Sequence, residues 1–191
     1  MLGICSSCKT REERETVEGY GNHIVQYSRE YSLCAGCETC SIMCALTHEG
    51  YTGPTNARIK VNLGTRDLMH EVLACQQCDD HPCYEACPKK DAAMRIDEET
   101  GVVYIVEEDC IGCGKCVKNC KFDPPRISIR KAKKRKEWKA VKCDLCRDNP
   151  EGPQCIKYCI VRCIGLSDDS VMLAPGVVPT YAQEEKEPAN A

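Results

Sequence analysis

Four cysteines stand close together at Cys110, Cys113, Cys116 and Cys120, separated by two, two and three residues. This spacing predicts a tight loop that runs into a short helix and holds the four thiols near one another. Thiolates spaced as C-x2-C-x2-C-x3-C are ligands of [4Fe–4S] clusters. A zinc site more often has two C-x2-C pairs with a longer spacer, so the third cysteine favours iron.

Three further quartets make the pattern an internal repeat. The quartets begin at residues 34, 75, 110 and 143, which predicts a stacked array of small units. Sixteen thiolates suffice for four cubane clusters, and zinc is the alternative for the last quartet taken alone because of its long middle gap. The further quartets are Cys34, Cys37, Cys40 and Cys44; Cys75, Cys78, Cys83 and Cys87; and Cys143, Cys146, Cys155 and Cys159.

Cysteine makes up 19 of the 191 residues, a frequency typical of disulfide scaffolds and metal proteins. Only one Phe and one Trp are present to fill a core, so metal binding is expected to supply folding free energy. The N-terminus has no basic segment followed by an apolar stretch, which predicts a cytoplasmic protein with reduced thiols. No apolar run approaches the length of a membrane span, so we expect no direct membrane insertion. The net charge of −3 indicates little about partners.

The chain is expected to divide into a polar N-terminal extension, a cysteine-rich domain and an extended C-terminal tail. These segments are residues 1–30, 31–168 and 169–191. Short elements should position the cysteine loops, with hairpins between quartets. The expected elements are a helix at 38–46, a strand at 57–61, one hairpin from 94–97 and 102–106, and another from 126–130 and 139–141.

The order of the quartets resembles the four-cluster ferredoxin subunits of molybdenum and tungsten enzymes. Such subunits occur with dimethyl sulfoxide reductase, formate dehydrogenase and hydrogenase, and with tungsten aldehyde oxidoreductase and benzoyl-coenzyme A reductase complexes. The resemblance rests on the C-x-G-C-x-x-C-x-x-x-C…H-E-G stretch from Cys34 to Gly50 and on Cys75–Pro88, Cys110–Cys120 and Lys142–Cys146. It implies an α+β fold of two fused ferredoxin-like β-α-β-β-α-β modules with pseudo-twofold symmetry, little regular secondary structure and a cluster-filled core.

The resemblance also implies a ligand pairing, in which the fourth cysteine of each quartet completes a neighbouring cluster. An inner module, residues 71–125, is inserted between the outer quartets at 34–44 and 143–159. Only Cys87 is followed by proline, which affects the turn rather than the ligation. Three clusters are the alternative to four. The implied sets are Cys34, Cys37, Cys40 and Cys159; Cys143, Cys146, Cys155 and Cys44; Cys75, Cys78, Cys83 and Cys120; and Cys110, Cys113, Cys116 and Cys87.

No nucleotide-binding, nucleophile-elbow or zinc-protease motif accompanies the cysteines. The prediction is therefore a subunit without catalytic residues, which relays single electrons. The resemblance implies a large tungsten- or molybdenum-pterin catalytic subunit as partner, together with a further redox subunit or a soluble electron carrier. The alternatives are a zinc-structured interaction protein without a redox role and a cluster-containing regulator that binds nucleic acid.

Two features lie outside this scheme. Cys5, Cys8 and Cys163 belong to no quartet. They are expected to form either an additional metal site, with zinc at the N-terminal pair, or a frayed pair and a buried thiol. Because Cys163 stands four residues after Cys159, a helix there would place it on the same face as a competing ligand. Residues 126–142 contain nine Lys or Arg and a single acid, Glu137. This basic stretch predicts a solvated hairpin tip, with docking of a redox partner and nucleic-acid binding as alternatives. Trp138 stands without the aromatic neighbours of a base-stacking platform, which argues against nucleic acid.

Overall fold

The computed structural model describes residues 23–26, 34–53, 55–64, 69–132 and 137–167. These residues form one helix of three turns and three single-turn helices, joined by short strands. The helices are α1 (Thr39–Glu49), α2 (Pro82–Glu85), α3 (Lys115–Lys118) and α4 (Gln154–Lys157). The strands are β1 (Ile24–Gln26), β2 (Lys60–Asn62), β3 (Glu71–Leu73), β4 (Met94–Ile96), β5 (Val103–Ile105), β6 (Ile127–Lys131), β7 (Trp138–Lys142) and β8 (Ile164–Leu166). Short helices and strands with little regular structure are consistent with a ferredoxin-like α+β fold.

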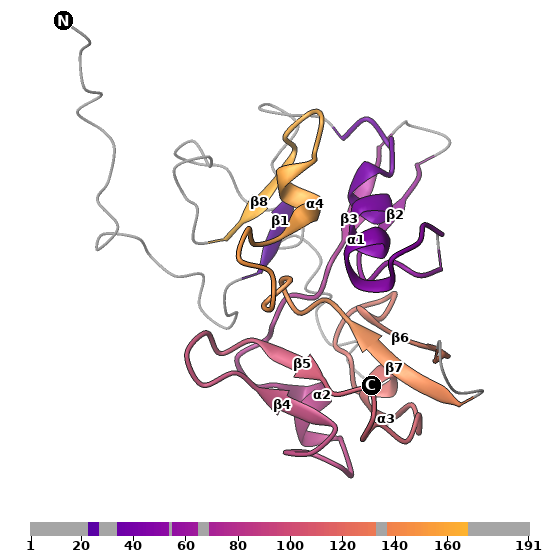
Figure 1. Cartoon of the computed structure of the whole chain (residues 1–191), viewed down its shortest axis with the longest axis vertical. Coiled ribbons are helices and arrows are strands. Elements are labelled where there is room, and N and C mark those ends of the chain that lie inside the picture. Colours follow the sequence, from indigo (N-terminus) through magenta and orange to yellow (C-terminus); the bar gives the residue numbers. More distant parts are fainter. Residues whose placement is uncertain (1–22, 27–33, 54, 65–68, 133–136, 168–191) are drawn as a thin grey trace, which may run out of the picture.

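The described strands pair into four antiparallel two-stranded sheets. Three are hairpins of neighbouring strands, β2–β3, β4–β5 and β6–β7. The fourth joins β1 to β8, with Ile24 opposite Leu166, so it ties the two ends of the described chain together. In Figure 1 this sheet lies with α1, α4, β2 and β3 in one half of the molecule, and the other two hairpins lie with α2 and α3 in the other half.

Two separate groups of buried side chains form the core. The larger one draws on both ends of the described chain, from Ile24 to Ile164, and six of its 14 buried members are cysteines. The smaller one lies between Ala93 and Ala140, around the β4–β5 hairpin, β6 and β7. Thiols therefore occupy interior positions that large apolar side chains fill in an ordinary domain.

Most sequence-predicted elements lie close to their expected positions. Both predicted hairpins form, and the loop of the first contains Gly101 at φ +70°. Helix α1 extends three residues beyond the expected end and stops at Gly50, whose left-handed conformation lets its N–H donate to the Leu46 carbonyl at 2.9 Å. The strand expected at 57–61 begins at Lys60, because Ala57 and Ile59 are buried in an irregular segment before it.

Strand β1 falls within the segment expected to be a polar extension, residues 1–30. Val25 is fully buried and Ile24 is 3% exposed, so part of this segment belongs to the fold. The C-terminal tail, residues 169–191, and residues 1–22 lie outside the described residues. Within the described ranges, no helix is long and apolar enough to cross a bilayer.

Candidate metal centres

All sixteen quartet cysteines lie in the described part of the chain, and none of them forms a disulfide. Short loops and single-turn helices present them, and left-handed residues make the sharp turns that this requires. Gly112 and Gly114, for example, lie at φ +64° and +74° between the cysteines of the third quartet. Of the described thiols, only those of Cys37 and Cys113 belong to residues classed as exposed.

An open pocket with about 350 Å³ of atom-free space is lined by four thiols, those of Cys75, Cys78, Cys83 and Cys120. We refer to it as the Cys75 pocket. The first three cysteines come from the second quartet and enter from the loop before α2 and from α2 itself. Cys120 comes from the third quartet and follows α3, which packs against α2. The structure therefore brings a fourth cysteine from one quartet to three cysteines of another.

A second open pocket, with about 340 Å³ of atom-free space, repeats this arrangement in the opposite sense. Cys110, Cys113 and Cys116 of the third quartet line it together with Cys87, the last cysteine of the second quartet. We refer to it as the Cys110 pocket. The two pockets thus exchange their fourth cysteines.

The outer quartets also interleave, because α1 packs against α4. Burial raises the pKa of the Cys155 thiol well above its usual value, and the thiolates of Cys143, Cys44 and Cys146 raise it further. We call these four cysteines the Cys143 group; Cys44 comes from α1 in the first quartet and the other three from the fourth quartet.

Around the first quartet, burial raises the pKa of the Cys40 thiol to about 11, and the thiolates of Cys34 and Cys159 raise it further. Cys159 belongs to the fourth quartet and lies after α4. We call Cys34, Cys40 and Cys159 the Cys34 group, with Cys37 on the same loop between its first two members.

The electrostatics of these four sites favour binding of a cationic metal group. Burial raises the pKa of Cys78 and of Cys116 to about 12, with like-charged neighbouring thiolates adding to the shift. Gathered thiols of this kind hold their protons unless positive charge replaces them, and iron supplies that charge. Four thiols around an open pocket are also the donor set of a cubane cluster, so the residues present fit a [4Fe–4S] group.

Backbone amides point at several of these sulfur atoms. The N–H groups of Arg58, Arg126 and Ala140 donate to the sulfurs of Cys44, Cys120 and Cys110, respectively, each at 3.3 Å. Hydrogen bonds to the sulfur atoms stabilise the thiolate form and are one of the factors that set the reduction potential of a cluster.

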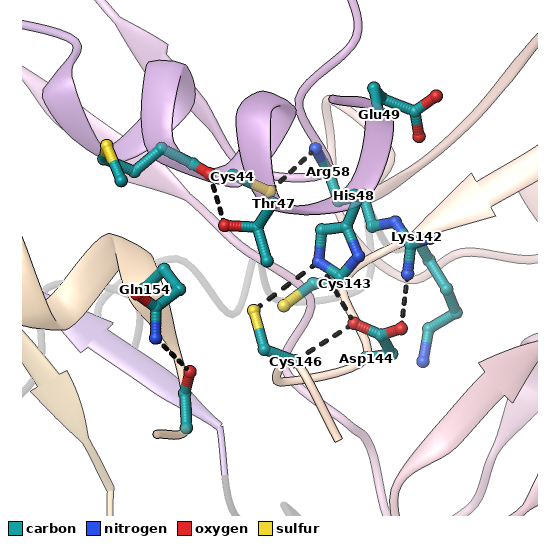
Figure 2. A network of polar contacts seen from close by, with 12 residues as sticks. Cys44, Thr47, His48, Glu49, Arg58, Lys142, Cys143, Asp144, Cys146 and Gln154 are labelled. Carbon is teal, nitrogen blue, oxygen red and sulfur yellow. Dashed lines mark hydrogen bonds and ion pairs between the residues drawn. The ribbon is translucent and has the colours of Figure 1, made fainter. Parts of the chain in front are cut away.

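Figure 2 shows a polar network beside the Cys143 group. His48 Nε2 lies 3.5 Å from Cys146 Sγ and 3.6 Å from Asp144 Oδ1. Asp144 also pairs with Arg58 and accepts the Cys146 N–H at 3.1 Å. Burial lowers the pKa of His48, and the nearby Arg58 charge lowers it further. No sequence signal predicted this contact between His48 and a thiol, because residues 48 and 146 are remote in the chain.

Three cations of the basic stretch are buried rather than solvated: Arg126, Lys139 and Lys142. Lys142 is 2% exposed, lines the Cys75 pocket, and donates to the Gln77 side-chain oxygen at 2.9 Å and to a backbone carbonyl. Lys139 donates to the Cys110 carbonyl at 2.5 Å. The solvated hairpin tip predicted from sequence is thus wrong for these three residues, which are buried. Residues 133–136 lie outside the described residues.

The cysteines that fall outside the quartets differ in position. Cys5 and Cys8 lie outside the described residues. Cys163 is 2% exposed, and its sulfur lies 3.7 Å from that of Cys159; it stands in the turn before β8, not on a helix shared with Cys159. In the ranges that the structure covers, no three His, Cys, Asp or Glu side chains surround a point suited to a single metal ion.

Comparison with known proteins agrees with this chemistry. Residues 67–169 match the family model described as 4Fe-4S dicluster domain. The polyferredoxin-like subunit of aliphatic sulfonate oxidoreductase from Pyrococcus furiosus is 36% identical over 158 residues, which cover 81% of this chain and 82% of that protein. The Escherichia coli electron transport protein HydN is 31% identical over 144 residues, covering 67% and 79% of the two chains.

A solved structure, the active-site complex BamBC of benzoyl-coenzyme A reductase, matches 76% of this chain and 78% of its own at 18% identity and a TM-score of 0.41. The family model covers more than half of the chain, and its description names the clusters for which the thiol-lined pockets are suited. The chain therefore belongs to the 4Fe-4S dicluster family and is an iron–sulfur electron-transfer protein of the ferredoxin type.

Proposed function

We propose that the chain holds four [4Fe–4S] clusters in a row and passes single electrons along them. The electrons would move between a tungsten- or molybdenum-pterin catalytic subunit and a further redox subunit or a soluble carrier. A bound cluster supplies one-electron redox chemistry. The chain itself binds the clusters, orders them, excludes water from most of their ligands and sets the charge around them.

The proposed ligands are the sixteen quartet cysteines. The Cys75 pocket and the Cys110 pocket each hold one cluster, and the Cys143 group holds a third. The Cys34 group, completed by Cys37, holds the fourth. The four thiols that line each pocket support the inner two assignments, and the mutual effects of the thiolates on one another's pKa support the outer two.

The order of the sites is the observation that carries the proposal. Besides burial, the Cys40 thiolate raises the pKa of Cys155, so the Cys34 group lies near the Cys143 group. Besides burial, the Cys75 thiolate raises the pKa of Cys143, so the Cys143 group lies near the Cys75 pocket.

Besides burial, the Cys83 thiolate likewise raises the pKa of Cys116, so the Cys75 pocket lies near the Cys110 pocket. These proximities support a single series of four sites. The exposed residues Cys37 and Cys113 belong to the first and last sites of this series. A row of sites with an exposed thiol at each end suits electron entry at one end and exit at the other.

We further propose that the domain, residues 31–168, consists of two fused ferredoxin-like modules with pseudo-twofold symmetry. The inner module, 71–125, would be inserted between the outer quartets at 34–44 and 143–159. Two separate buried cores support this division, since the larger one joins the two ends of the described chain and the smaller one lies between Ala93 and Ala140.

The names of similar proteins support a place in an oxidoreductase complex. Besides the Pyrococcus furiosus subunit, they include formate hydrogenlyase subunit 2 of Escherichia coli, 28% identical over 167 residues. The tungsten or molybdenum link rests on the resemblance of the quartets. A cytoplasmic location, and zinc at Cys5 and Cys8, stay predictions from the sequence.

Metal analysis tests the cluster assignment directly. Protein purified under anaerobic conditions should be brown, lose colour with dithionite, and contain about sixteen irons and as many acid-labile sulfides per chain if four cubanes are bound. The reduced protein should give an electron paramagnetic resonance (EPR) spectrum of interacting clusters. A colourless preparation loaded with zinc would refute the proposal.

Purification of the tagged chain from its native host under anaerobic conditions tests the partner. The expected complex contains a large subunit with pterin and either tungsten or molybdenum, in about one equivalent per catalytic chain. If the complex contains iron–sulfur clusters but neither metal, the partner assignment fails while the cluster assignment survives.

A further inference from the structure

A seventeenth thiol lies at the Cys34 group and has no place in the sixteen proposed ligands. Cys163 is 2% exposed, and its sulfur lies 3.7 Å from the sulfur of Cys159. Its backbone N–H donates to the Cys159 sulfur at 3.4 Å. Burial raises the pKa of the Cys163 thiol, and the thiolates of Cys159 and Cys34 raise it further. Cys163 therefore contacts Cys159 and shares a buried cluster with Cys34, a second member of the Cys34 group.

The backbone fixes Cys163 in this position. After α4 the chain turns through Arg162, which lies at φ +51° and donates its N–H to the Cys159 carbonyl at 3.2 Å. Cys163 follows directly and precedes β8, which is paired with β1. A left-handed residue on one side and a paired strand on the other thus turn Cys163 back over Cys159, so the contact is built into the fold.

On the basis of the four-cluster proposal above, we infer that Cys163 is a reserve ligand of the cluster held by the Cys34 group and can take the place of Cys159. The two sulfurs stand at about the separation of two thiolates on one tetrahedral metal, about 3.8 Å for metal–sulfur bonds of about 2.3 Å. An iron bound by one thiol is therefore within reach of the other after a side-chain rotation.

The exchange requires no oxidant or reductant. Cys163 would hold the iron position that Cys159 leaves, with one iron–sulfur bond broken and one formed, and the proton of the Cys163 thiol would pass to Cys159. Iron keeps its oxidation state, and one thiolate and one thiol are present before and after. The chain thereby protects the fourth ligand position of an end cluster, which has an exposed cysteine, Cys37, among its other ligands.

The Cys75 pocket provides a matched control. It is lined by four cysteines, and no fifth thiol is among its lining residues. Removal of Cys120 there leaves three thiols for the cluster. Removal of Cys159 leaves four, because Cys163 joins Cys34, Cys37 and Cys40. If Cys163 is a reserve ligand, Cys159→Ala should therefore keep more iron than Cys120→Ala.

The experiment compares iron content, visible absorbance and EPR spectra of the full-length chain. Cys159→Ala, Cys163→Ala, the double variant and Cys120→Ala are purified anaerobically without added thiol, because a small thiol can occupy an empty iron corner. We expect wild-type iron content in both single variants of the Cys159–Cys163 pair. The double variant and Cys120→Ala should each lose between one iron and one whole cluster of four. The EPR signal of one cluster should change in Cys159→Ala.

The double variant decides the result. If it holds as much iron as Cys159→Ala and gives the same spectrum, or if Cys159→Ala loses as much iron as Cys120→Ala, the reserve-ligand inference is overturned. Loss of a cluster in Cys163→Ala alone would overturn it too, because Cys163 would then be the resident ligand. A wild-type chain without clusters would instead refute the proposed function.

Discussion

Gly112 lies where the third cysteine loop meets strand β7, and an alanine there should damage the Cys110 pocket. Gly112 is at φ +64°, and a Cβ built on it would lie 2.0 Å from the Trp138 carbonyl oxygen and 2.7 Å from its carbon. Real Cβ contacts are essentially never shorter than 3.0 Å. The strand would therefore have to move away by about 1 Å, because backbone atoms cannot rotate aside as a side-chain end can.

Gly114 in the same loop separates the two contributions to the effect. It lies at φ +74°, and a Cβ on it would meet no atom within 4 Å. Gly114→Ala therefore pays only for the left-handed backbone, about 1–2 kcal/mol. Gly112→Ala has a similar backbone cost and also displaces β7. Overpacking of this kind destabilises a protein further, by about 1–3 kcal/mol, which gives a total loss of stability of about 2–5 kcal/mol.

The displacement should also reach a thiol. The Ala140 N–H on β7 donates to the Cys110 sulfur at 3.3 Å, and a shift of about 1 Å would break that hydrogen bond. Gly112→Ala should therefore change the EPR signal and the potential of the cluster in the Cys110 pocket. Gly114→Ala should leave both close to the wild type.

Loss of visible absorbance in guanidinium chloride, measured anaerobically, gives the assay. With an m-value of a few kcal/mol per molar, the midpoint should fall by about 0.5–1 M in Gly112→Ala and by about 0.2–0.5 M in Gly114→Ala. Equal midpoints and equal EPR spectra in the two variants would refute the reasoning, because the only intended difference between them is the contact with Trp138.

Two further outcomes follow from single side chains. In cluster-free protein at neutral pH, iodoacetamide should alkylate Cys37 faster in the wild type than in Thr39→Val, because the Thr39 hydroxyl, 3.4 Å from the Cys37 sulfur, lowers the pKa of that thiol and leaves more thiolate. Peptide mass spectrometry should show the two rates converge above the usual thiol pKa of 9.0; equal rates at neutral pH would contradict the prediction. Lys142→Met should lower the midpoint potential of the cluster in the Cys75 pocket by on the order of 60 mV, a tenfold change in the one-electron equilibrium, because a buried ammonium stabilises an added electron. Potentiometric EPR with the exposed Lys118→Met as control checks this, and equal potentials would rule it out.

Local features of the fold could be predicted from the sequence because they depend on neighbouring residues. The spacing of the cysteines predicted the quartets, and alternating apolar residues around Gly101 predicted the β4–β5 hairpin. The β1–β8 sheet was not predicted, because three residues such as Ile24, Val25 and Gln26 carry no usable periodicity. Its partner strand is also about 140 residues away, with Gln26 opposite Ile164.

Charge was the main source of error. A Lys or Arg in a hydrophilic stretch is usually solvated, and this expectation placed Lys139 and Lys142 on a surface tip. Lys139 is buried where it reaches the Cys110 carbonyl, and Lys142 where it reaches Gln77 and the Cys75 pocket, all supplied by other parts of the chain. From the sequence, burial of a lysine could only have been suspected for Lys142, because it stands directly before the Cys143 loop.

The junction between the inner and outer sites shows how these unpredicted residues complete the series. Gln77 was only a spacer in the Cys75–Cys78 loop when read from sequence, yet it is 2% exposed. Its side-chain oxygen accepts the Val103 N–H at 3.0 Å and the Lys142 ammonium at 2.9 Å, while its nitrogen donates to the Cys143 carbonyl at 3.0 Å.

One amide side chain therefore ties the loop of the Cys75 pocket to the loop of the Cys143 group and orients the buried ammonium between them. Fixed distance and fixed charge are what a relay between two clusters requires, since both the coupling and the potential depend on them. The quartets alone bring thiols to each proposed cluster. In the proposed row, Gln77 and Lys142 hold the outer sites and the inner sites in one rigid structure.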